Sequence, residues 1–263
     1  MPNDIPSSRR DTILARLSLG ESVHAGALAK EFSVSEDAIR RDLRGLAAEG
    51  LCRRVYGGAL PVVEGARPMA ERVGEDVHRK RALADAAVRV IEPSSLVFID
   101  NGSSNLALVE TLPSYLNLTI ATSSVTIAAA LQHRDDIDLL VVGGMIDRMV
   151  GGAVDGTALE AIARLNIDLC VLGACAVSAE GGVSAYDPAD ASFKRALTAH
   201  SRSTIVLATN DKLGQHAPHR VLGVDALTQI VVEHDADADL VRDLTKVGAT
   251  IARADPQDPR GQR

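Results

Sequence analysis

Three loops in the middle of the 263-residue sequence carry residue types that bind phosphate groups. Each loop follows a short apolar run, and together they supply the candidate ligands Asp100, Gly102, Ser103, Ser104, Thr122, Ser123, Gly143 and Gly144. Small hydroxyl side chains and free backbone N–H groups at a helix start can donate to a phosphate, and glycine lets a ligand approach the backbone. Serine and threonine also cap helices without a ligand, and glycine also makes turns. Three such loops in succession favour a binding pocket.

A second candidate site is the stretch from Ser35 to Leu46, which is expected to form a short helix with an arginine-rich face. Ser35 can cap its first turn, while apolar residues spaced four and then three positions apart point inward together. Arg40, Arg41 and Arg44 then remain in solvent. Exposed arginines are often only a solvated surface, but three on one helix can also bind DNA phosphates and the groove.

Two further helices are expected before this one. The first begins at Ser7 or Ser8 and ends near Ser18, and the second ends at Phe32. Ser33-Val34 makes the turn into the arginine-rich helix. This order of helix, helix, tight turn and helix is the helix-turn-helix plan, in which the last helix enters the major groove of DNA.

After Gly50 the pattern changes to an alternating segment over 51–59 with a Gly-Gly break, which is typical of a small hairpin or wing. Arg53, Arg54 and Tyr56 of this segment could lie along a phosphate backbone. They could also simply keep an edge strand solvated.

The charge distribution fits local docking on DNA better than general adhesion. The formal net charge is −7, yet residues 1–60 hold nine Lys and Arg against eight Asp and Glu, a balance of +1. The remaining residues carry 19 basic against 27 acidic side chains, a balance of −8. An acidic body therefore follows a small segment with clustered arginines.

The first sixty residues resemble the DeoR family of bacterial transcriptional regulators. The residues that carry the resemblance are Arg10, Ile13, Leu17, Leu28, Ala29, Phe32, Val34, Ser35, Ile39, Arg40, Arg41, Asp42, Leu43, Gly50, Arg54, Gly57, Gly58 and Ala59. The departure is Ala38, where the family usually has threonine. The resemblance implies a winged helix-turn-helix that binds operator DNA, with a changed operator preference if that hydroxyl contacts DNA.

Residues 61–76 contain prolines and glycines without a convincing period and are expected to form a linker. Over 77–254, apolar runs of strand length alternate with helical segments, which predicts an α/β fold with a largely parallel sheet covered on both faces. Ligands of such sheets bind beyond the carboxyl ends of the strands. Residues 255–263 are expected to be a disordered tail.

The resemblance to the DeoR family extends over roughly residues 8–252. It implies a second domain like the ribose-phosphate isomerase type of fold that senses a phosphorylated sugar. It adds Lys212 to the candidate effector ligands, alongside Asp100 and the serine loop. Two positions depart from the family pattern: Ser123 stands where asparagine is usual, and Thr209 where aspartate is usual.

We therefore expect a repressor of a carbohydrate operon, released from its operator by a phosphorylated sugar. Because one small module buries too little surface for tight specific binding, a homo-oligomer, dimer or tetramer, is expected. The alternative is a sugar-phosphate isomerase-like enzyme with an acid–base set of Asp100, Asp168, Asp211 and Lys212.

No cofactor or metal is expected. His216 and His219 are three positions apart but have no obvious further ligands nearby. Three cysteines without CxxC spacing, no signal pattern and no apolar run of membrane-spanning length favour a cytoplasmic protein that does not contact the membrane.

Overall fold

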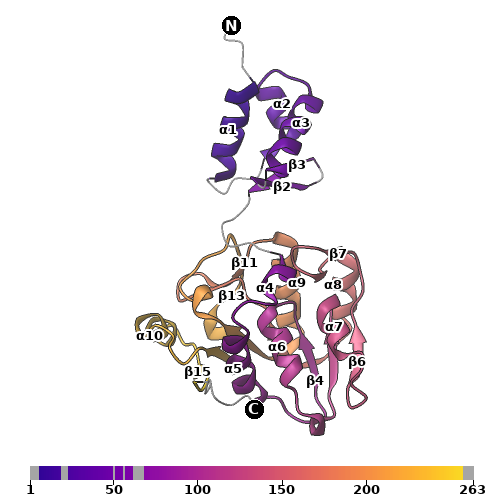
Figure 1. Cartoon of the computed structure of the whole chain (residues 1–263), viewed down its shortest axis with the longest axis vertical. Coiled ribbons are helices and arrows are strands. Elements are labelled where there is room, and N and C mark those ends of the chain that lie inside the picture. The colour runs from indigo at the N-terminus through magenta and orange to yellow at the C-terminus, as the bar shows by residue number, and fades with distance from the viewer. Residues whose placement is uncertain (1–5, 19–22, 50, 56, 62–67, 257–263) are drawn as a thin grey trace. The chain divides into compact units, whose positions relative to one another are not determined.

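The computed structural model describes residues 6–18, 23–49, 51–55, 57–61 and 68–256 (Figure 1). The chain divides into two compact units, Met1–Ala66 and Arg67–Arg263. From residue 257 onward, the predicted tail lies outside the described residues.

The first unit is a helix-turn-helix with a wing, as predicted. Its elements are α1 (Pro6–Ser18), β1 (Val23–His24), α2 (Ala25–Glu31), α3 (Glu36–Ala48), β2 (Cys52–Val55) and β3 (Gly58–Pro61). Strands β2 and β3 form the expected antiparallel hairpin, and β1 adds a strand on the other side of β3. The sequence did not reveal β1, because two residues are too few to show a period. Apolar side chains from the helices, β1 and the wing close a small core.

The second unit is built on a seven-stranded sheet in the order β15-β14-β12-β9-β4-β5-β6, and all its neighbouring strands are parallel. The strands are β4 (Leu96–Ile99), β5 (Thr119–Thr122), β6 (Asp138–Val141), β9 (Ile167–Leu172), β12 (Ser201–Ala208), β14 (Gln229–Val232) and β15 (Ile251–Arg253). The predicted α/β fold class is confirmed. The edge strand β15 was not predicted, because it is short and ends in an arginine.

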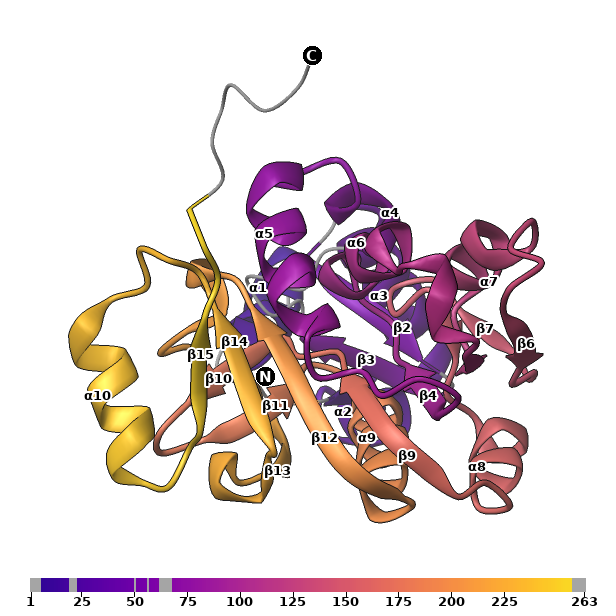
Figure 2. The same ribbon diagram turned by 90° about the horizontal axis from the view of Figure 1, so that it is seen from below.

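Helices cover both faces of this sheet. They are α4 (Met69–Arg72), α5 (Val77–Val88), α6 (Ser103–Thr111), α7 (Val125–Leu131), α8 (Gly156–Ile162), α9 (Pro188–Ala199) and α10 (Ala238–Lys246). Figure 2 shows α5 and α6 on one side of the sheet and α8 and α9 on the other. Short 3-10 turns lie at η1 (Ser114–Leu116), η2 (Asn210–Lys212) and η3 (Val224–Ala226).

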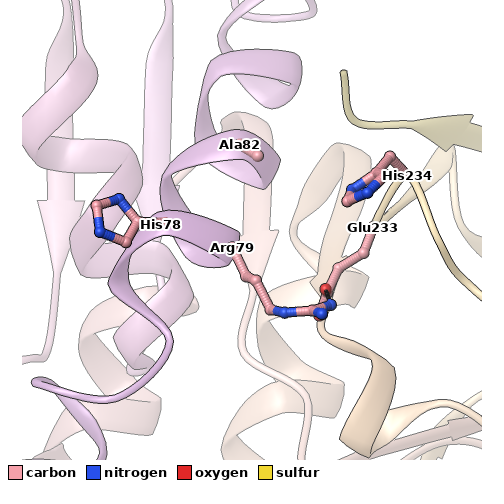
Figure 3. Close-up of a pocket in the computed structure, with 5 residues that line it drawn as sticks. All are labelled: His78, Arg79, Ala82, Glu233 and His234. Carbon is pink, nitrogen blue, oxygen red and sulfur yellow. Dashed lines mark hydrogen bonds and ion pairs between the residues drawn. The ribbon is translucent and has the colours of Figure 1, made fainter. Parts of the chain in front are cut away.

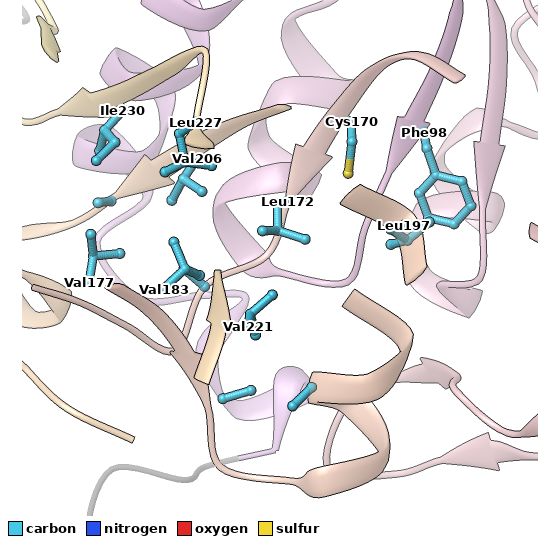
Figure 4. Packing of buried hydrophobic residues seen from close by; sticks show 14 of the residues in the cluster. Phe98, Cys170, Leu172, Val177, Val183, Leu197, Val206, Val221, Leu227 and Ile230 are labelled. Atoms are coloured by element: carbon cyan, nitrogen blue, oxygen red, sulfur yellow. The ribbon is translucent and has the colours of Figure 1, made fainter. Parts of the chain in front are cut away.

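Alternate residues of the central strands enter two separate cores. In β4, Phe98 points into one core while Val97 and Ile99 point into the other. Figure 4 shows the first core, where Phe98 and Cys170 lie close to α9. The Phe98 ring meets the Phe193 ring of α9 edge to face, with centroids 6.1 Å apart. Burial on both sides explains why these strands read as continuous apolar runs.

Smaller strands outside the main sheet extend the second unit. Strands β10 (Ala176–Ser178), β11 (Gly182–Ala185) and β13 (His219–Leu222) form an antiparallel sheet, and β7 (Ile146–Asp147) pairs with β8 (Gly152–Ala153). No helix among the described residues is long and apolar enough to cross a membrane.

The structure corrects the predicted linker over 61–76. Pro61 is the last residue of β3, and the part described from residue 68 contains α4. Met69 of α4 is 1% exposed and donates its N–H to Met149 O at 3.2 Å. Lys80 Nζ fixes the end of α4 by donating to Arg72 O at 2.6 Å and to Glu75 O at 2.5 Å. A helix of one turn is too short to show a sequence period, so the sequence of this stretch was interpreted as a linker.

Candidate functional site

The arginine-rich helix α3 forms as predicted. Ser35 has an extended backbone, and its Oγ accepts a hydrogen bond from Ala38 N at 3.2 Å, which caps the helix. Ile39, Leu43 and Leu46 are all buried at 2% exposure or less. The opposite face of α3 is therefore available to a partner. Ala38 is half-buried at the amino end of this helix.

The three arginines of α3 are exposed but not equivalent. Arg40 is held by Glu36, with 2.9 Å between its guanidinium and Oε2, and Asp37 lies 3.8 Å away. Arg44 Nε donates to Arg40 O at 3.3 Å. Arg41 forms no ion pair or side-chain hydrogen bond with another described residue. Arg41 is therefore the arginine of α3 whose charge is most available to a phosphate.

The contact of Asp42 with α1 helps to set which face of α3 is exposed. Its carboxylate accepts a hydrogen bond from Arg9 Nε at 2.7 Å, and the second guanidinium contact is 2.6 Å long. Both side chains are nearly buried, at 8% and 11% exposure. This pair ties α1 to α3 and fixes the rotation of α3. The sequence did not reveal it, because the two residues lie on different helices.

The wing is only partly described. Arg54 on β2 is exposed, as a phosphate-binding residue must be. The side chain of Arg53 and the whole of Tyr56 lie outside the described residues.

The three candidate loops all leave the carboxyl edge of the parallel sheet. The chain order reverses there: β5 and β6 lie on one side of β4, and β9, β12, β14 and β15 lie on the other. Such a switch point is where ligands of open α/β sheets bind. The loops after β4, β9 and β12 are therefore neighbours, as are those after β4, β5 and β6.

Asp100 lies at the centre of this edge but is fully buried. Its Oδ2 accepts from Gly173 N at 2.9 Å and lies 2.9 Å from Lys194 Nζ, which is also 2.5 Å from Asp190 Oδ1. Burial acts to lower the pKa of Lys194, but the charges of Asp100 and Asp190 outweigh it and raise the pKa, so the ammonium stays charged. Asp100 thus anchors the loops rather than offering a free carboxylate to a ligand.

The contact between Lys194 and Asp190 was partly predictable from the sequence. They are four positions apart on α9 and so lie on one helix face. Nothing local indicated that Asp100, on a different strand, would complete the cluster. Gly173 is required beside it, because a Cβ there would lie 2.0 Å from Asn101 O.

Of the other predicted loop residues, Thr122 and Ser123 are buried and hydrogen-bonded within the protein, whereas the two glycines are exposed. Thr122 is fully buried: its Oγ1 donates to Ile99 O at 2.7 Å and accepts from Ser124 N at 3.1 Å, so it links the loops after β4 and β5. Ser123 Oγ accepts from Asn101 Nδ2 at 3.3 Å. Gly143 and Gly144 are exposed, and Gly144 adopts a φ of +149° beside the Asp155 carboxylate.

Within the described part of the chain, three buried polar atoms at this edge have no hydrogen-bond partner: Asn101 Oδ1, Ser104 Oγ and Asn210 Oδ1. Leaving such an atom unpaired costs about 1–3 kcal/mol. Ser103 and Ser104 are both almost completely buried at the start of α6, next to Gly102, which has an extended backbone. Unpaired polar atoms at a switch point are what a polar ligand or ordered water would satisfy.

Lys212 lies in η2, beyond the carboxyl end of β12. Its ammonium makes no ion pair or hydrogen bond with another described residue. Burial, followed by the charge of Arg72, lowers the pKa of Lys212 to about 8. The charge of Lys80 acts in the same direction. Arg72, Lys80 and Lys212 therefore bring three basic groups to this edge, and the charge of Asp211 acts against them on Lys212.

A separate cavity of about 160 Å³ lies beside this edge, lined by His78, Arg79, Ala82, Glu233 and His234 (Figure 3). The Arg79 guanidinium pairs with Glu233 and, at 3.1 Å, with Asp235. Since the basic group of this cavity is already neutralised by two carboxylates, the cavity is poorly suited to phosphate. Glu233 Oε1 also accepts from Asn210 N at 2.8 Å, so the cavity wall supports η2.

The structure rules against the acid–base set of the enzyme alternative. Asp168 lies at the amino end of β9, where it accepts from Leu96 N at 3.0 Å and approaches Arg202. It is therefore on the opposite edge of the sheet from Asp100 and Lys212. Among the described residues, no group of three His, Cys, Asp or Glu side chains could hold a metal ion. His216 Nδ1 instead lies 3.2 Å from Ser178 Oγ.

Comparison with known proteins gives two adjoining family matches. The DeoR-like helix-turn-helix domain matches residues 9–62, and the DeoR C terminal sensor domain matches residues 75–234. The glycerol-3-phosphate regulon repressor of Escherichia coli strain K12 is 28% identical over 212 residues, covering 80% of this chain and 84% of that protein. The HTH-type transcriptional regulator GlpR of Haloferax volcanii is 26% identical over 249 residues, covering 94% and 97%. Among solved structures, ribose 5-phosphate isomerase A of Methanocaldococcus jannaschii matches 52% of this chain and 54% of that chain, with 13% identity and a TM-score of 0.36.

A winged helix-turn-helix followed by a parallel α/β unit with a polar, basic carboxyl edge defines a DNA-binding regulator with a sensor domain. Its relatives are named as regulators and repressors, which places the chain among regulators rather than enzymes. The chain belongs to the DeoR family. The predicted family is thereby confirmed.

Proposed function

We propose that this protein is a cytoplasmic repressor of a carbohydrate operon, released from its operator by a phosphorylated sugar. In this proposal α3 enters the major groove, and Ser35, Arg40, Arg41 and Arg44 contact DNA, with Arg53, Arg54 and Tyr56 of the wing extending the contact. The protein binds as a homo-oligomer, because a single module of this size buries too little surface for specific binding. The names of its relatives, which include a glycerol-3-phosphate regulon repressor, support this direction.

The observation that carries the effector half is the polar edge after β4 and β12. Ser104 Oγ and Asn210 Oδ1, which have no hydrogen-bond partner among the described residues, lie on the same edge as the ammonium of Lys212. A phosphorylated sugar offers acceptors for the hydroxyl and ammonium, and sugar hydroxyls that can donate to the amide oxygen. An anion would also offset the repulsion from Arg72, which acts after burial in lowering the pKa of Lys212.

Lys212→Met is expected to weaken binding of a phosphorylated sugar by about tenfold to a hundredfold, because a hydrogen bond to a charged group contributes about 1.5–3 kcal/mol. Binding is measured by calorimetry, using ligands selected by a thermal-shift screen of phosphorylated sugars and sugar alcohols. Lys246→Met is the control, since Lys246 is exposed on α10. Unchanged affinity in Lys212→Met would remove Lys212 from the site.

The same binding is expected to depend on pH. Only the protonated form of Lys212 attracts a phosphate, and with a pKa of about 8 that form falls from about nine-tenths at pH 7 to about one-tenth at pH 9. Wild-type affinity should therefore be highest near pH 7 and decline as the pH rises through 8. Below about pH 6 the phosphate itself takes up a proton, so the comparison is made from pH 7 upward. The Lys212→Met variant should lose this decline, and a decline that persists in the variant would assign the titration to another group.

Release from DNA is the final test of the proposal. A ligand that binds the sensor domain should weaken operator binding by about 5- to 150-fold, which corresponds to a coupling free energy of about 1–3 kcal/mol. The operator is first selected from a random duplex library by the wild-type protein, and binding is followed by fluorescence anisotropy. A ligand that binds tightly and leaves operator affinity unchanged would refute the release mechanism.

A further inference from the structure

The sheet of the second unit ends in an unusually apolar edge. Strand β6 pairs only with β5 among the described strands, so its outer backbone groups have no partner in the ladder. Large apolar side chains that are 41–79% exposed surround it, and we call them the β6 edge patch: Val125, Leu140, Val141, Met145 and Ile146. Figures 1 and 2 both place α7, β6 and β7, which carry these residues except Met145, together at one side of the unit.

This patch stands out against the rest of the described surface. It holds five of the ten large apolar side chains that are strongly exposed there. Leu140 and Val141 are consecutive in the strand, so they face opposite sides of the sheet, and both sides of the edge are apolar. Proteins usually protect an edge strand by keeping it short, or with charged side chains, proline, a bulge or a covering segment. The sequence of β6, Asp-Leu-Leu-Val, has a single charge at its amino end, and the three residues that follow are all large and apolar.

The opposite edge of the same sheet shows the usual protection. Strand β15 has three residues, and none of them is a large exposed apolar side chain. The guanidinium of Arg253 folds back to donate to His234 O at 3.2 Å and to Ala236 O at 3.1 Å. The two edges of this sheet therefore differ: β15 exposes no large apolar side chain, whereas β6 does.

The charges at the two ends of the patch fit a second copy of the same chain. Asp138 begins β6, and Arg148 directly follows β7, in the turn of the β7–β8 hairpin that comes after β6 in the chain. Neither side chain forms an ion pair or hydrogen bond with another described residue. When two β6 strands meet antiparallel across a twofold axis, the amino end of each faces the carboxyl end of the other. Asp138 of one copy then faces the carboxyl end of the other copy's β6, from which the chain leads into the hairpin that carries Arg148, and this occurs twice in the same interface.

We propose that the β6 edge patch is the surface through which two copies of this chain associate, with their β6 strands antiparallel about a twofold axis. This inference rests on the proposed function in one respect: specific DNA binding requires a second DNA-binding module. The surface itself is assigned from its exposed side chains, its open strand edge and its complementary ends.

The test is sedimentation of the full-length chain without DNA, which gives the dissociation constant of the dimer. Val141→Lys places an unpaired ammonium in each half of the interface and should raise this constant at least about tenfold. Val247→Lys is the matched control, because Val247 follows α10, away from β6, and is also exposed, at 44%. It should leave the constant unchanged. Thermal unfolding checks that both variants keep their fold, as expected for exposed positions.

A charge exchange tests the antiparallel arrangement. Asp138→Arg should weaken the dimer by about twofold to fivefold, and adding Arg148→Asp should restore it. The inference is overturned if the wild-type chain is monomeric at tens of micromolar. It is also overturned if Val141→Lys dimerises like the wild type, or if the double exchange fails to recover. Operator binding is measured separately. A chain that dimerises through β6 but binds no operator would refute the proposed DNA-binding function and leave the β6 interface standing.

Discussion

Replacing Arg41 with alanine is expected to weaken binding to the selected operator by about 1–3 kcal/mol if Arg41 contacts a base. Arg41 is the exposed arginine of α3 that has no partner among the described residues. If it contacts a phosphate instead, the slope of log affinity against log salt should fall in magnitude by about 0.9 for each copy of α3 on the DNA. Fluorescence anisotropy across a salt series measures both quantities.

Arg40→Ala should have a smaller effect than Arg41→Ala. Arg40 is held by Glu36 and Asp37, so part of its charge is already compensated before DNA binds. Arg81→Ala provides the control for a general loss of positive charge. Arg81 is exposed on α5 and has no ion pair with another described residue. Wild-type affinity and salt slope in Arg41→Ala would show that α3 does not bind DNA through this residue.

Replacing Lys194 with methionine is expected to lower the free energy of unfolding of the second unit by about 3–5 kcal/mol. The Lys194 side chain is 3% exposed and neutralises both Asp100 and Asp190. Methionine fills a similar volume but leaves two buried carboxylates facing each other without a cation. Urea unfolding followed by circular dichroism measures the change, and the transition of the larger unit is the one expected to shift.

Lys246→Met is the control for this substitution. Lys246 pairs with Asp243 at 2.9 Å on the exposed face of α10, and such surface pairs contribute about 0–1 kcal/mol. A second variant, Lys194→Met with Asp190→Leu, removes one carboxylate together with the ammonium and should recover part of the loss. A cost below about 1 kcal/mol for Lys194→Met would contradict the view that this cluster holds the carboxyl edge together.

Much of the fold was predictable because its signals are local. The cap at Ser35 and the spacing of Ile39, Leu43 and Leu46 are set within one helix. The continuous apolar runs of β4, β9 and β12 indicated a sheet buried on both faces. Short elements escaped prediction, since β1 and α4 span too few residues to show a period.

The candidate site was only partly predictable. The loops after β4 and β5 were found from their small polar residues, but the role of each side chain depends on distant partners. Asp100 is bound by Lys194 and Gly173, whereas Ser104 Oγ has no partner among the described residues. These two residues lie in one loop, and nothing in its sequence indicated which would be fixed and which would be free.

The sequence by itself determined the order of the longer helices and strands, the helix-turn-helix with its arginines, and the position of the polar loops at strand ends. These follow from near neighbours, through helical and strand periods, caps and turns. Only the tertiary structure decided that Asp42 turns toward Arg9, that Lys194 joins Asp100, and that β6 is left as an apolar edge. Each of these depends on how elements far apart in the chain meet, which the order of residues within one element does not contain.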